Sequence, residues 1–260
     1  MAAAASGDHA QKARTMKTSN KKLTLSHALG ALFIITTPTI LSMQQPAIRD
    51  VNGRTALHMA VYYGLESKMR KLIATGIDVN ASDKRGNRPL NYAVESMWAA
   101  TMVPMLLEAG ADPNAINQNG QTPLFNLINS YLLPQEQAPI ITMLTRAGCN
   151  VNAQDKSGAT VLHHAAWNCK PLELAQIIIA AGADTTIRTI HEDTPLHLAL
   201  KSPHTELAIQ LIEHGTDIDA CNRRGERPIF LLTRMCGGQT ETMQPLLTRR
   251  ILELGCSMVE

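Results

Sequence analysis

Apolar and polar residues follow one another in a pattern that recurs six times along this chain. Each unit opens with a short polar block, usually Asp or Asn, two further residues and then Gly, which leads into an apolar run. A second apolar run follows and ends in a Gly-containing tail. Apolar residues three or four positions apart within a run share one face of a helix. The pattern therefore predicts two short helices in every unit, with a turn before the first.

The spacing of the units predicts the architecture. They start at residues 50, 83, 117, 155, 189 and 222, so successive starts are 33 to 38 residues apart. Such a period is typical of solenoid proteins, in which each repeat packs against its neighbours only. Aromatic residues are just 3% of the sequence, so we expect a core of Leu, Ile, Val, Ala and Met between helices. The expected fold is an all-α stack of helix pairs.

Two units carry a specific motif, TALHMA at 55–60 and TPLHLA at 194–199. On these residues the chain resembles the ankyrin repeat family, whose TPLHxA signature they match. The resemblance extends over about residues 50–255. It implies an ankyrin-repeat solenoid of stacked helix-turn-helix pairs with projecting β-hairpin turns, in a domain spanning 49–260. It also implies a protein–protein interaction module or scaffold that is no enzyme and needs no cofactor.

The residue types of the motif fit this fold. Gly in the polar block accepts a positive φ, as a tight turn requires. Thr then caps the first helix, and its apolar face, which includes Leu57 and Ala60, packs on the second helix. A glycine is expected to end each second helix, at Gly76, Gly110, Gly148, Gly182, Gly215 and Gly255.

Three units depart from the motif. The second and sixth replace the capping Thr by Arg88 and Arg227, so their turns should be looser or differently hydrogen-bonded. The motif's His position holds Asn91 in the second unit and Phe230 in the sixth. The fifth unit has Glu192 where the turn glycine belongs, and because a left-handed conformation costs about 1–2 kcal/mol there, we expect its hairpin to change shape.

Two units contain additional residues between their helices. Prolines and glycines indicate loops at 130–139 and 236–245. They support an alternative function, in which these loops build the site of an accessory or effector protein. A cluster of His164, Cys169 and Cys236 would favour that alternative. A structural spacer without partners is a third hypothesis.

In ankyrin-like stacks, partners usually dock on the concave face formed by the turn tips and first helices. Counting from the start of each unit, we expect these residues to face it: Tyr62, Tyr63, Glu95, Ser96, Asn129, Ser130, Trp167, Asn168, Lys201, Ser202, Arg234 and Met235. Tyr, Trp and Arg most often carry interface energy, so Tyr62, Tyr63, Trp167 and Arg234 are the predicted anchors. For each tyrosine the alternative is that it merely covers a neighbouring repeat.

Charge suggests the kind of partner. From Met43 onward the chain has 19 basic and 21 acidic side chains, and this balance gives no reason to expect nucleic-acid binding. The turn tips nevertheless carry an excess of cations, which would attract a partner with an acidic surface. The predicted steering residues are Lys84, Arg85, Arg223 and Arg224, with Arg54 and Lys156 on the same rim. We expect a monomer.

The sequence contains little that indicates catalysis or metal binding. His163 and His164 are adjacent, so on a helix they diverge by about 100° and cannot easily share a metal. The resemblance gives His163 a scaffold role, because the family uses this imidazole to hydrogen-bond neighbouring backbone. The cysteines show no metal-site spacing and are expected to be buried free thiols: Cys149, Cys169, Cys221, Cys236 and Cys256.

The resemblance also implies one modification. Residues 72–80 read Leu, then five residues before Asp-Val-Asn. This looks like the pattern around ankyrin asparagines that a 2-oxoglutarate oxygenase hydroxylates in animals. Asn80 is therefore a candidate hydroxylation site in a host that has this enzyme.

The segment before the repeats, residues 1–48, allows three interpretations: a leader for export, a degenerate capping repeat, and a membrane anchor or organelle signal. Lysines precede an uncharged apolar stretch at 23–43, which favours a leader for export. Pro38 and several Thr and Ser residues argue against a stable membrane span. In the alternative, the segment is a degenerate capping repeat of a cytoplasmic protein, because MQQPAIRD at 43–50 aligns with GADPNAIN at 110–117.

Overall fold

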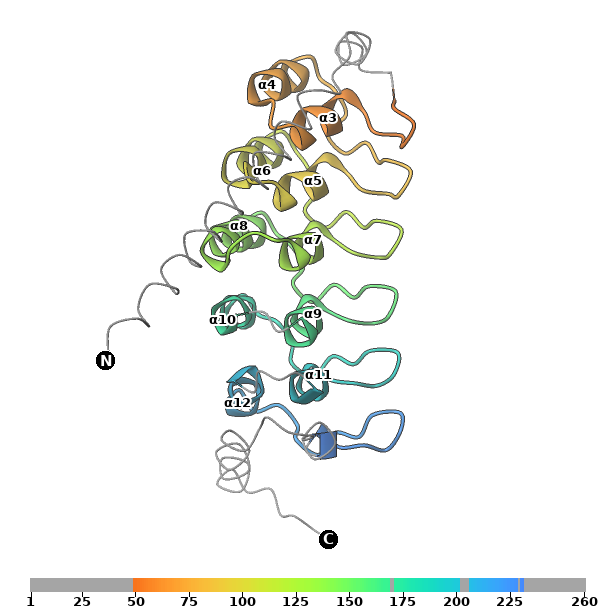
Figure 1. Ribbon diagram of the computed structural model, residues 1–260, viewed down its shortest axis with the longest axis vertical. Coiled ribbons are helices and arrows are strands. Elements are labelled where there is room, and N and C mark those ends of the chain that lie inside the picture. The colour runs from red at the N-terminus through yellow and green to blue at the C-terminus, as the bar shows by residue number, and fades with distance from the viewer. Residues whose placement is uncertain (1–48, 169–170, 202–205, 229, 232–260) are drawn as a thin grey trace, which may run out of the picture. The chain divides into compact units, whose positions relative to one another are not determined.

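The computed structural model of this protein describes residues 49–168, 171–201, 206–228 and 230–231. They form helix pairs stacked in order along the chain, in two layers (Figure 1). The first helices make one layer: α3 (Ala56–Tyr62), α5 (Pro89–Glu95), α7 (Pro123–Asn129), α9 (Val161–Trp167) and α11 (Pro195–Lys201). The second helices make the other: α4 (Glu66–Ala74), α6 (Ala99–Glu108), α8 (Pro134–Arg146), α10 (Leu172–Ala180) and α12 (Glu206–Glu213). The predicted all-α ankyrin fold is confirmed.

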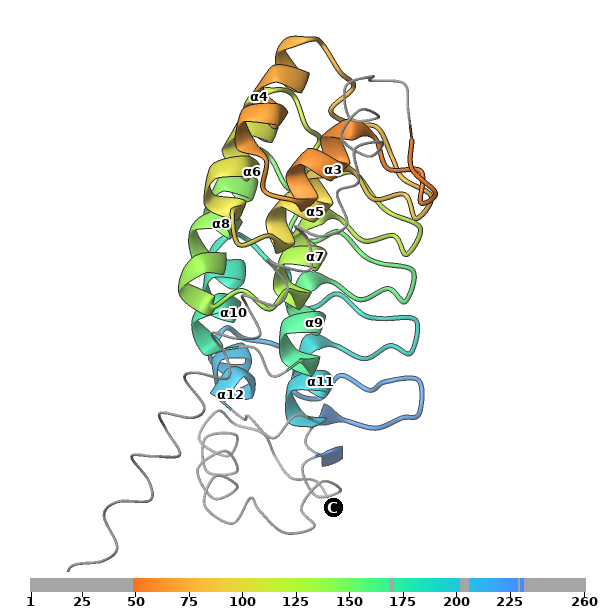
Figure 2. The ribbon, with the colours of Figure 1, turned by 45° about the horizontal axis from the view of Figure 1, so that its top comes forward.

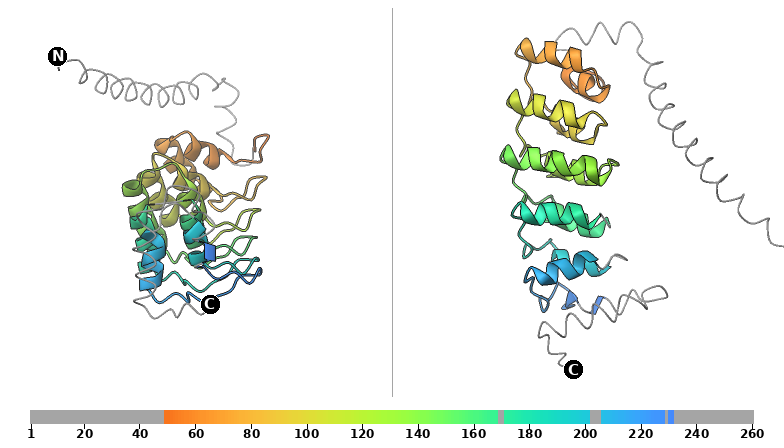
Figure 3. Two further views of the ribbon diagram at one scale, coloured as in Figure 1. Left: turned by 60° about the horizontal axis from the view of Figure 1, so that its bottom comes forward. Right: turned by 90° about the vertical axis from the view of Figure 1, so that its left-hand side faces the viewer.

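Figure 3 shows the stacked helix pairs from two further sides, and the buried apolar side chains of both helix layers place the core between the layers and between successive repeats. Leu57 and Leu196 of the motif are fully buried, and so are Ile141 and Leu144 on the second helix of the third repeat. Phe125 is the largest of the fully buried side chains among the described residues, and the next largest are Leu, Ile and Met. This aliphatic core matches the expectation from the low aromatic content.

A Thr–His pair organises the start of three first helices. In the first repeat, the N–H of Thr55 donates to His58 Nδ1 at 3.1 Å, and the Thr55 hydroxyl lies 2.9 Å from the same nitrogen. His58 Nε2 lies 3.1 Å from the carbonyl oxygen of Asn87 in the next repeat. Thr160–His163 and Thr194–His197 repeat these contacts. The scaffold role expected for the motif histidine is confirmed.

The departures from the motif change this hydrogen bonding. In the second repeat, Asn91 Oδ1 accepts from the N–H of Arg88 at 2.8 Å, so the amide replaces the imidazole acceptor. This is the different hydrogen bonding that we expected. In the third repeat, Phe125 has no acceptor to offer, and the buried hydroxyl of Thr122 is left without a hydrogen bond.

The polar blocks project from one edge of the stack as hairpin-shaped turns (Figures 1 and 2). Among the described residues none is assigned to a strand. Each turn is closed by its own backbone, and one backbone hydrogen bond links successive turns, as where the N–H of Lys84 donates to the carbonyl of Asn52 at 2.9 Å. We call these turns fingers 1 to 6: residues 50–54, 83–87, 117–121, 155–159, 189–193 and 222–226.

Finger 5 keeps the shape of the others, so the prediction that Glu192 changes the shape of its hairpin is wrong. Glu192 itself adopts the left-handed conformation, with φ at 62°. The closing bonds from Glu192 N–H to Thr189 O and from Thr189 N–H to Asp193 O measure 2.8 and 3.0 Å. The bonded neighbours on both sides hold the turn, and the strain falls on one residue.

Replacing Glu192 by Gly is therefore expected to stabilise the protein by about 1 kcal/mol, because Gly adopts a positive φ without steric cost. The measurement is the urea midpoint of the purified full-length variant. Glu192→Ala is the control, since it removes the carboxylate and keeps the strain. Equal midpoints for the Gly and Ala variants would contradict the prediction.

Residues 130–139 do not form the loop that we expected. Helix α8 begins at Pro134 and contains Pro139, so only 130–133 connect α7 to α8. Proline is tolerated at the first helical position, where its missing N–H would be unpaired anyway. Gln137 is buried and donates to the carbonyl of Leu132 at 2.9 Å, which fixes the start of the helix. The inserted residues lengthen the helix instead.

A ladder of asparagines links the turns that follow the second helices. Asn80 Nδ2 donates to the carbonyl of Gly110 at 2.9 Å, and Asn80 Oδ1 accepts from the N–H of Asp112 at 2.8 Å. Asn114 and Asn152 make the same pair of bonds to the following repeat. Thr186 holds the next equivalent position, and its hydroxyl donates to Asp184 within the same turn.

Candidate functional site

The face expected to bind a partner is made by the fingers and the first helices, which stand side by side through the stack (Figure 2). Among the predicted residues, Tyr62, Glu95 and Trp167 are exposed and lie at the ends of α3, α5 and α9. Arg234 lies outside the described residues, as do the 236–245 segment and residues 1–48.

Tyr62 both covers the next repeat and presents a free surface. Its ring makes edge contacts with Tyr63 and Tyr92, with centroids 5.2 and 6.2 Å apart, and the guanidinium of Arg54 lies 5.5 Å from its centroid. Tyr62 nevertheless remains 53% exposed. The two alternatives for this tyrosine are therefore compatible, because the contacts with its neighbours orient a ring that still faces solvent.

Trp167 is 61% exposed and lies beside a polar network between the third and fourth repeats. Asn168 Nδ2 donates to Asn129 Oδ1 at 2.8 Å. His164 Nε2 lies 2.9 Å from Asp155 Oδ2, which fixes this imidazole against finger 4. Burial alone would raise the pKa of Asp155, but hydrogen bonds from Ser157 and His164 lower it. His164 is thus held by its neighbours, while Cys169 and Cys236 lie outside the described residues.

The cations of the face fall into two groups. Arg54 is paired with Asp50 at 2.7 Å and Lys201 with Asp193 at 3.1 Å, so these two are partly neutralised. The predicted steering residues are exposed and form no ion pair within the described part of the chain: Lys84, Arg85, Arg223 and Arg224. Lys156 belongs with them.

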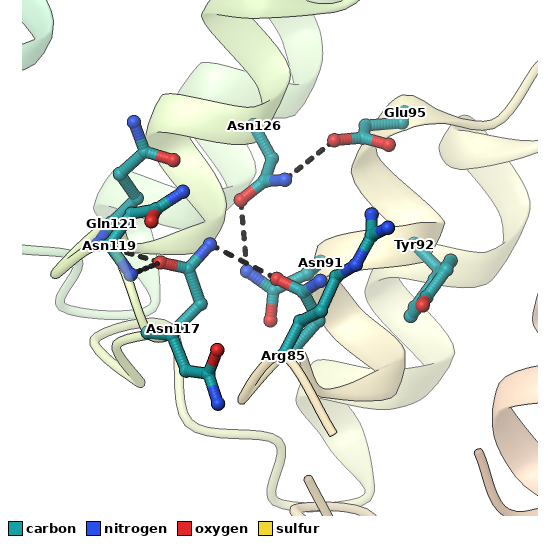
Figure 4. Close-up of a pocket in the computed structure, with 10 residues that line it drawn as sticks. Arg85, Asn91, Tyr92, Glu95, Asn117, Asn119, Gln121 and Asn126 are labelled. Atoms are coloured by element: carbon teal, nitrogen blue, oxygen red, sulfur yellow. Dashed lines mark hydrogen bonds between the residues drawn. The ribbon is translucent and has the colours of Figure 1, made fainter. Parts of the chain in front are cut away.

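A polar cleft of about 500 Å³ lies between fingers 2 and 3 and the helices α5 and α7 (Figure 4). Asn91 Nδ2 donates to Asn126 Oδ1 at 3.0 Å, and Asn126 Nδ2 donates in turn to Glu95 Oε1 at 2.5 Å. Glu95 is exposed as a residue, but the surrounding cleft partly desolvates its carboxylate; this desolvation raises the pKa of Glu95, and the bond from Asn126 lowers it in part. The further lining residues are Arg85, Asn87, Tyr92, Asn117, Gln118, Asn119 and Gln121.

The sequence prediction selected Arg85 and Glu95 as contact residues but not the amides of the cleft. Finger 3 did give an indication, since it carries Asn117 and Gln118 where fingers 2 and 4 each carry Asp and Lys. The expected set also missed exposed apolar residues in the segments that join the paired helices. Trp98 is 42% exposed and Tyr131 fully exposed, and the ring of Trp98 lies over Gly64.

The free cysteines differ in their surroundings. Cys149 is buried, as expected, and burial raises the pKa of its thiol to about 12. Cys221 is exposed, so the expectation of a buried thiol is wrong there, because it lies at the surface between α12 and finger 6. Cys169, Cys236 and Cys256 lie outside the described residues.

We expect iodoacetamide at neutral pH to alkylate Cys221 in the folded protein and to leave Cys149 unmodified, since only an accessible thiolate reacts. Peptide mass spectrometry after a short exposure measures both sites in one sample. Labelling in urea is the control and should modify both. Equal labelling of the two thiols without urea would contradict the prediction.

Asn80 is half-buried, and its side-chain amide makes both bonds of the asparagine ladder. These bonds give the residue a structural role that sequence reasoning did not foresee. Hydroxylation at Cβ would leave the amide nitrogen and oxygen in place, so the modification remains a prediction.

The described residues hold no cluster of three or more His, Cys, Asp or Glu side chains suited to a metal ion. None of the helices among them is long and apolar enough to cross a bilayer. The described stack and its exposed face define a solenoid protein that presents side chains from successive repeats on one surface.

Comparison with known families identifies this solenoid. Models of ankyrin repeats match residues 32–117, 144–199 and 191–223. The chain belongs to the ankyrin repeat family. Domains of this family typically serve protein–protein interaction and are generally non-catalytic.

Several curated proteins are similar over part of their length. Human B-cell lymphoma 3 protein is 32% identical over 179 residues, which is 65% of this chain and 38% of the relative. The E3 ubiquitin-protein ligase KEG of Arabidopsis thaliana is 24% identical over 225 residues, or 71% of this chain and 14% of the relative. Human neurogenic locus notch homolog protein 1 is 30% identical over 150 residues, which is 58% of this chain and 6% of the relative. The chain thus spans less than two fifths of the length of each of these relatives.

Proposed function

We propose that this protein binds a partner protein on the face formed by the fingers and the ends of the first helices, and that it acts without catalysis. The observation that carries the proposal is the exposure of Tyr62 and Trp167 on that face, each at the last residue of a first helix. Large aromatic side chains bury much area at low entropic cost, so exposed ones are preferred contact anchors.

The charges on the fingers support a partner with an acidic surface. Lys84 and Arg85 extend from finger 2, and Arg223 and Arg224 from finger 6, all exposed and without an ion pair among the described residues. Such rim charges increase the rate of association more than the final affinity. Ionic strength should therefore affect the on-rate chiefly.

Trp167→Ala is expected to reduce recovery of the partner about tenfold, because a central aromatic anchor contributes more than about 1.4 kcal/mol when buried. The tagged full-length protein is expressed in its source cells, and cross-linked partners are quantified by mass spectrometry. Tyr131→Ala is the matched control, since it removes a fully exposed aromatic that belongs to the segment joining α7 to α8 and not to a first helix or a finger.

A partner lost equally with both variants would show that the face is wrongly placed. A set of recovered proteins unchanged by Trp167→Ala and Tyr62→Ala together would favour a structural spacer. Trp167→Ala and Tyr131→Ala should each keep the unfolding midpoint of the wild-type protein, because both side chains are largely exposed.

A further inference from the structure

Some polar side chains of the cleft between fingers 2 and 3 are held by hydrogen bonds to their neighbours, and others form no hydrogen bond or ion pair with the described residues. Asn126 is fixed between Asn91 and Glu95, and Asn117 Nδ2 donates to Asn87 Oδ1 at 3.1 Å (Figure 4). Within the described part of the chain, no hydrogen bond or ion pair is made by three further side chains of the cleft: Arg85, Asn119 and Gln121.

We propose that this cleft binds an extended peptide segment of the partner, with an Asp or Glu side chain on Arg85 and main-chain amides on Asn119 and Gln121. The inference rests on the proposed function and specifies the chemistry of the ligand at one place on the face. It concerns a groove made by two neighbouring repeats, the second and the third.

Arg85 is available for a carboxylate because the neighbouring acid is already occupied. Asp83 Oδ2 accepts from the Tyr92 hydroxyl at 2.6 Å, and Asp83 Oδ1 accepts from the N–H groups of Arg85 and Asn87, both at 2.8 Å. The guanidinium is therefore left to the ligand. Its planar fork matches the two oxygens of a carboxylate.

Among anionic ligands, the charges of the cleft favour a monoanion over a dianion. Glu95 lies in the same cleft as Arg85, and its Oε1 accepts from Asn126. A phosphate with two negative charges would be repelled by that carboxylate, with a single guanidinium to neutralise it. An Asp or Glu side chain brings one charge, so Glu95 repels it less than it repels a dianion, and Arg85 can still pair with it.

The side-chain amides of Asn119 and Gln121 can hydrogen-bond the main chain of a peptide. The side chains of Asn119 and Gln121 each present an N–H donor and a carbonyl acceptor, as a peptide group does. Figure 4 shows them at one end of the cleft, with Tyr92 and Glu95 at the other. A segment that crosses the cleft can thus pair its backbone at one end and its acidic side chain near the middle.

The lining also argues against a free small molecule as the ligand. Small-molecule pockets are lined predominantly by apolar and aromatic side chains. Here Tyr92 is the one aromatic residue among ten that line the cleft, and the rest are amides, Arg85 and Glu95. A peptide segment gains further affinity from the rest of its protein, so it does not need an apolar pocket.

The test is selection of short random peptides displayed on phage against the full-length protein. Enriched sequences are synthesised with capped ends, and their binding is measured by fluorescence anisotropy. We expect the sequences to share an Asp or Glu and to bind Arg85→Glu about tenfold more weakly than wild type. Replacing that acid by Lys in the peptide should restore binding to Arg85→Glu.

Arg146→Glu is the control, since Arg146 is an exposed arginine at the end of the second helix α8, outside the fingers and the first helices. It makes the same change of net charge and should alter binding less than about twofold. Asn119→Ala combined with Gln121→Ala should weaken binding without removing the preference for acids.

The proposal is overturned if no peptide is enriched, if the enriched peptides lack an acid, or if both arginine variants lose binding equally. Binding that depends on Trp167 and not on Arg85 would leave the proposed function in place and remove this inference. If neither Trp167→Ala nor Arg85→Glu reduces partner recovery, both the proposed function and this inference are contradicted.

Discussion

His163→Ala is expected to lower the free energy of unfolding by about 3 kcal/mol, from lost hydrogen bonds and a cavity. His163 is completely buried. Its Nδ1 accepts from the N–H of Thr160 at 3.1 Å, so Nε2 carries the proton and donates to the carbonyl of Asp193 in the next repeat at 3.1 Å. Alanine leaves both backbone groups without this partner and opens a space between two repeats.

Urea unfolding of the full-length variant at neutral pH measures this change. His164→Ala is the control, because the neighbouring imidazole is half-buried and faces Asp155 instead of the next repeat. We expect it to cost about 1 kcal/mol. A smaller loss for His163→Ala than for His164→Ala would contradict the role assigned to the motif histidine.

Acidification from pH 7 to pH 5 is expected to destabilise the fold by about 2 kcal/mol through His163 alone. Burial lowers the pKa of His163 to about 4, below its ordinary value of 6.5, and it also lowers the pKa values of His58 and His197. Folding thus favours the neutral imidazoles. Their contribution is complete above pH 6.5 and is lost as the pH falls towards 4.

Unfolding midpoints measured in steps from pH 7.5 to 4.5 would follow this loss. His163→Asn is the matched variant, because Asn91 already fills this position in the second repeat and accepts from the backbone in the same way. It should reduce the pH dependence while the other two histidines retain theirs. The carboxylates act at lower pH, since hydrogen bonds and Lys201 lower the pKa of Asp193 against the opposing effect of burial. A wild-type midpoint that stays constant down to pH 5 would contradict the prediction.

The repeat fold could be predicted from the sequence because its signal is local and periodic. The Leu57 and His58 positions, the turn glycines and the 33-residue step each recur, so the order of the helices follows directly. Glu192 shows where this reasoning fails. A substitution considered alone should reshape its turn, whereas bonded neighbours on both sides keep the turn and strain the residue.

The candidate face was predicted only in part, because its groups pair with partners that the repeat pattern does not indicate. Lys201 reads as a free cation in the sequence but pairs with Asp193 eight positions earlier. The amides of Asn91 and Asn126 are 35 residues apart in the chain and bond to each other. Exposed residues between the paired helices, such as Tyr131, follow no repeat pattern, so periodicity gave no reason to select them.

The asparagine ladder implies that the stack is not equally stiff along its length. Asn80, Asn114 and Asn152 join the turns of the first four repeats in sequence, and Thr186 keeps its hydroxyl within its own turn. Under a pulling force along the stack, we expect the repeats joined by the ladder to resist together. The fourth and fifth repeats, which meet after Thr186, should separate first. A partner that binds both ends of the stack would therefore bend the protein at this junction.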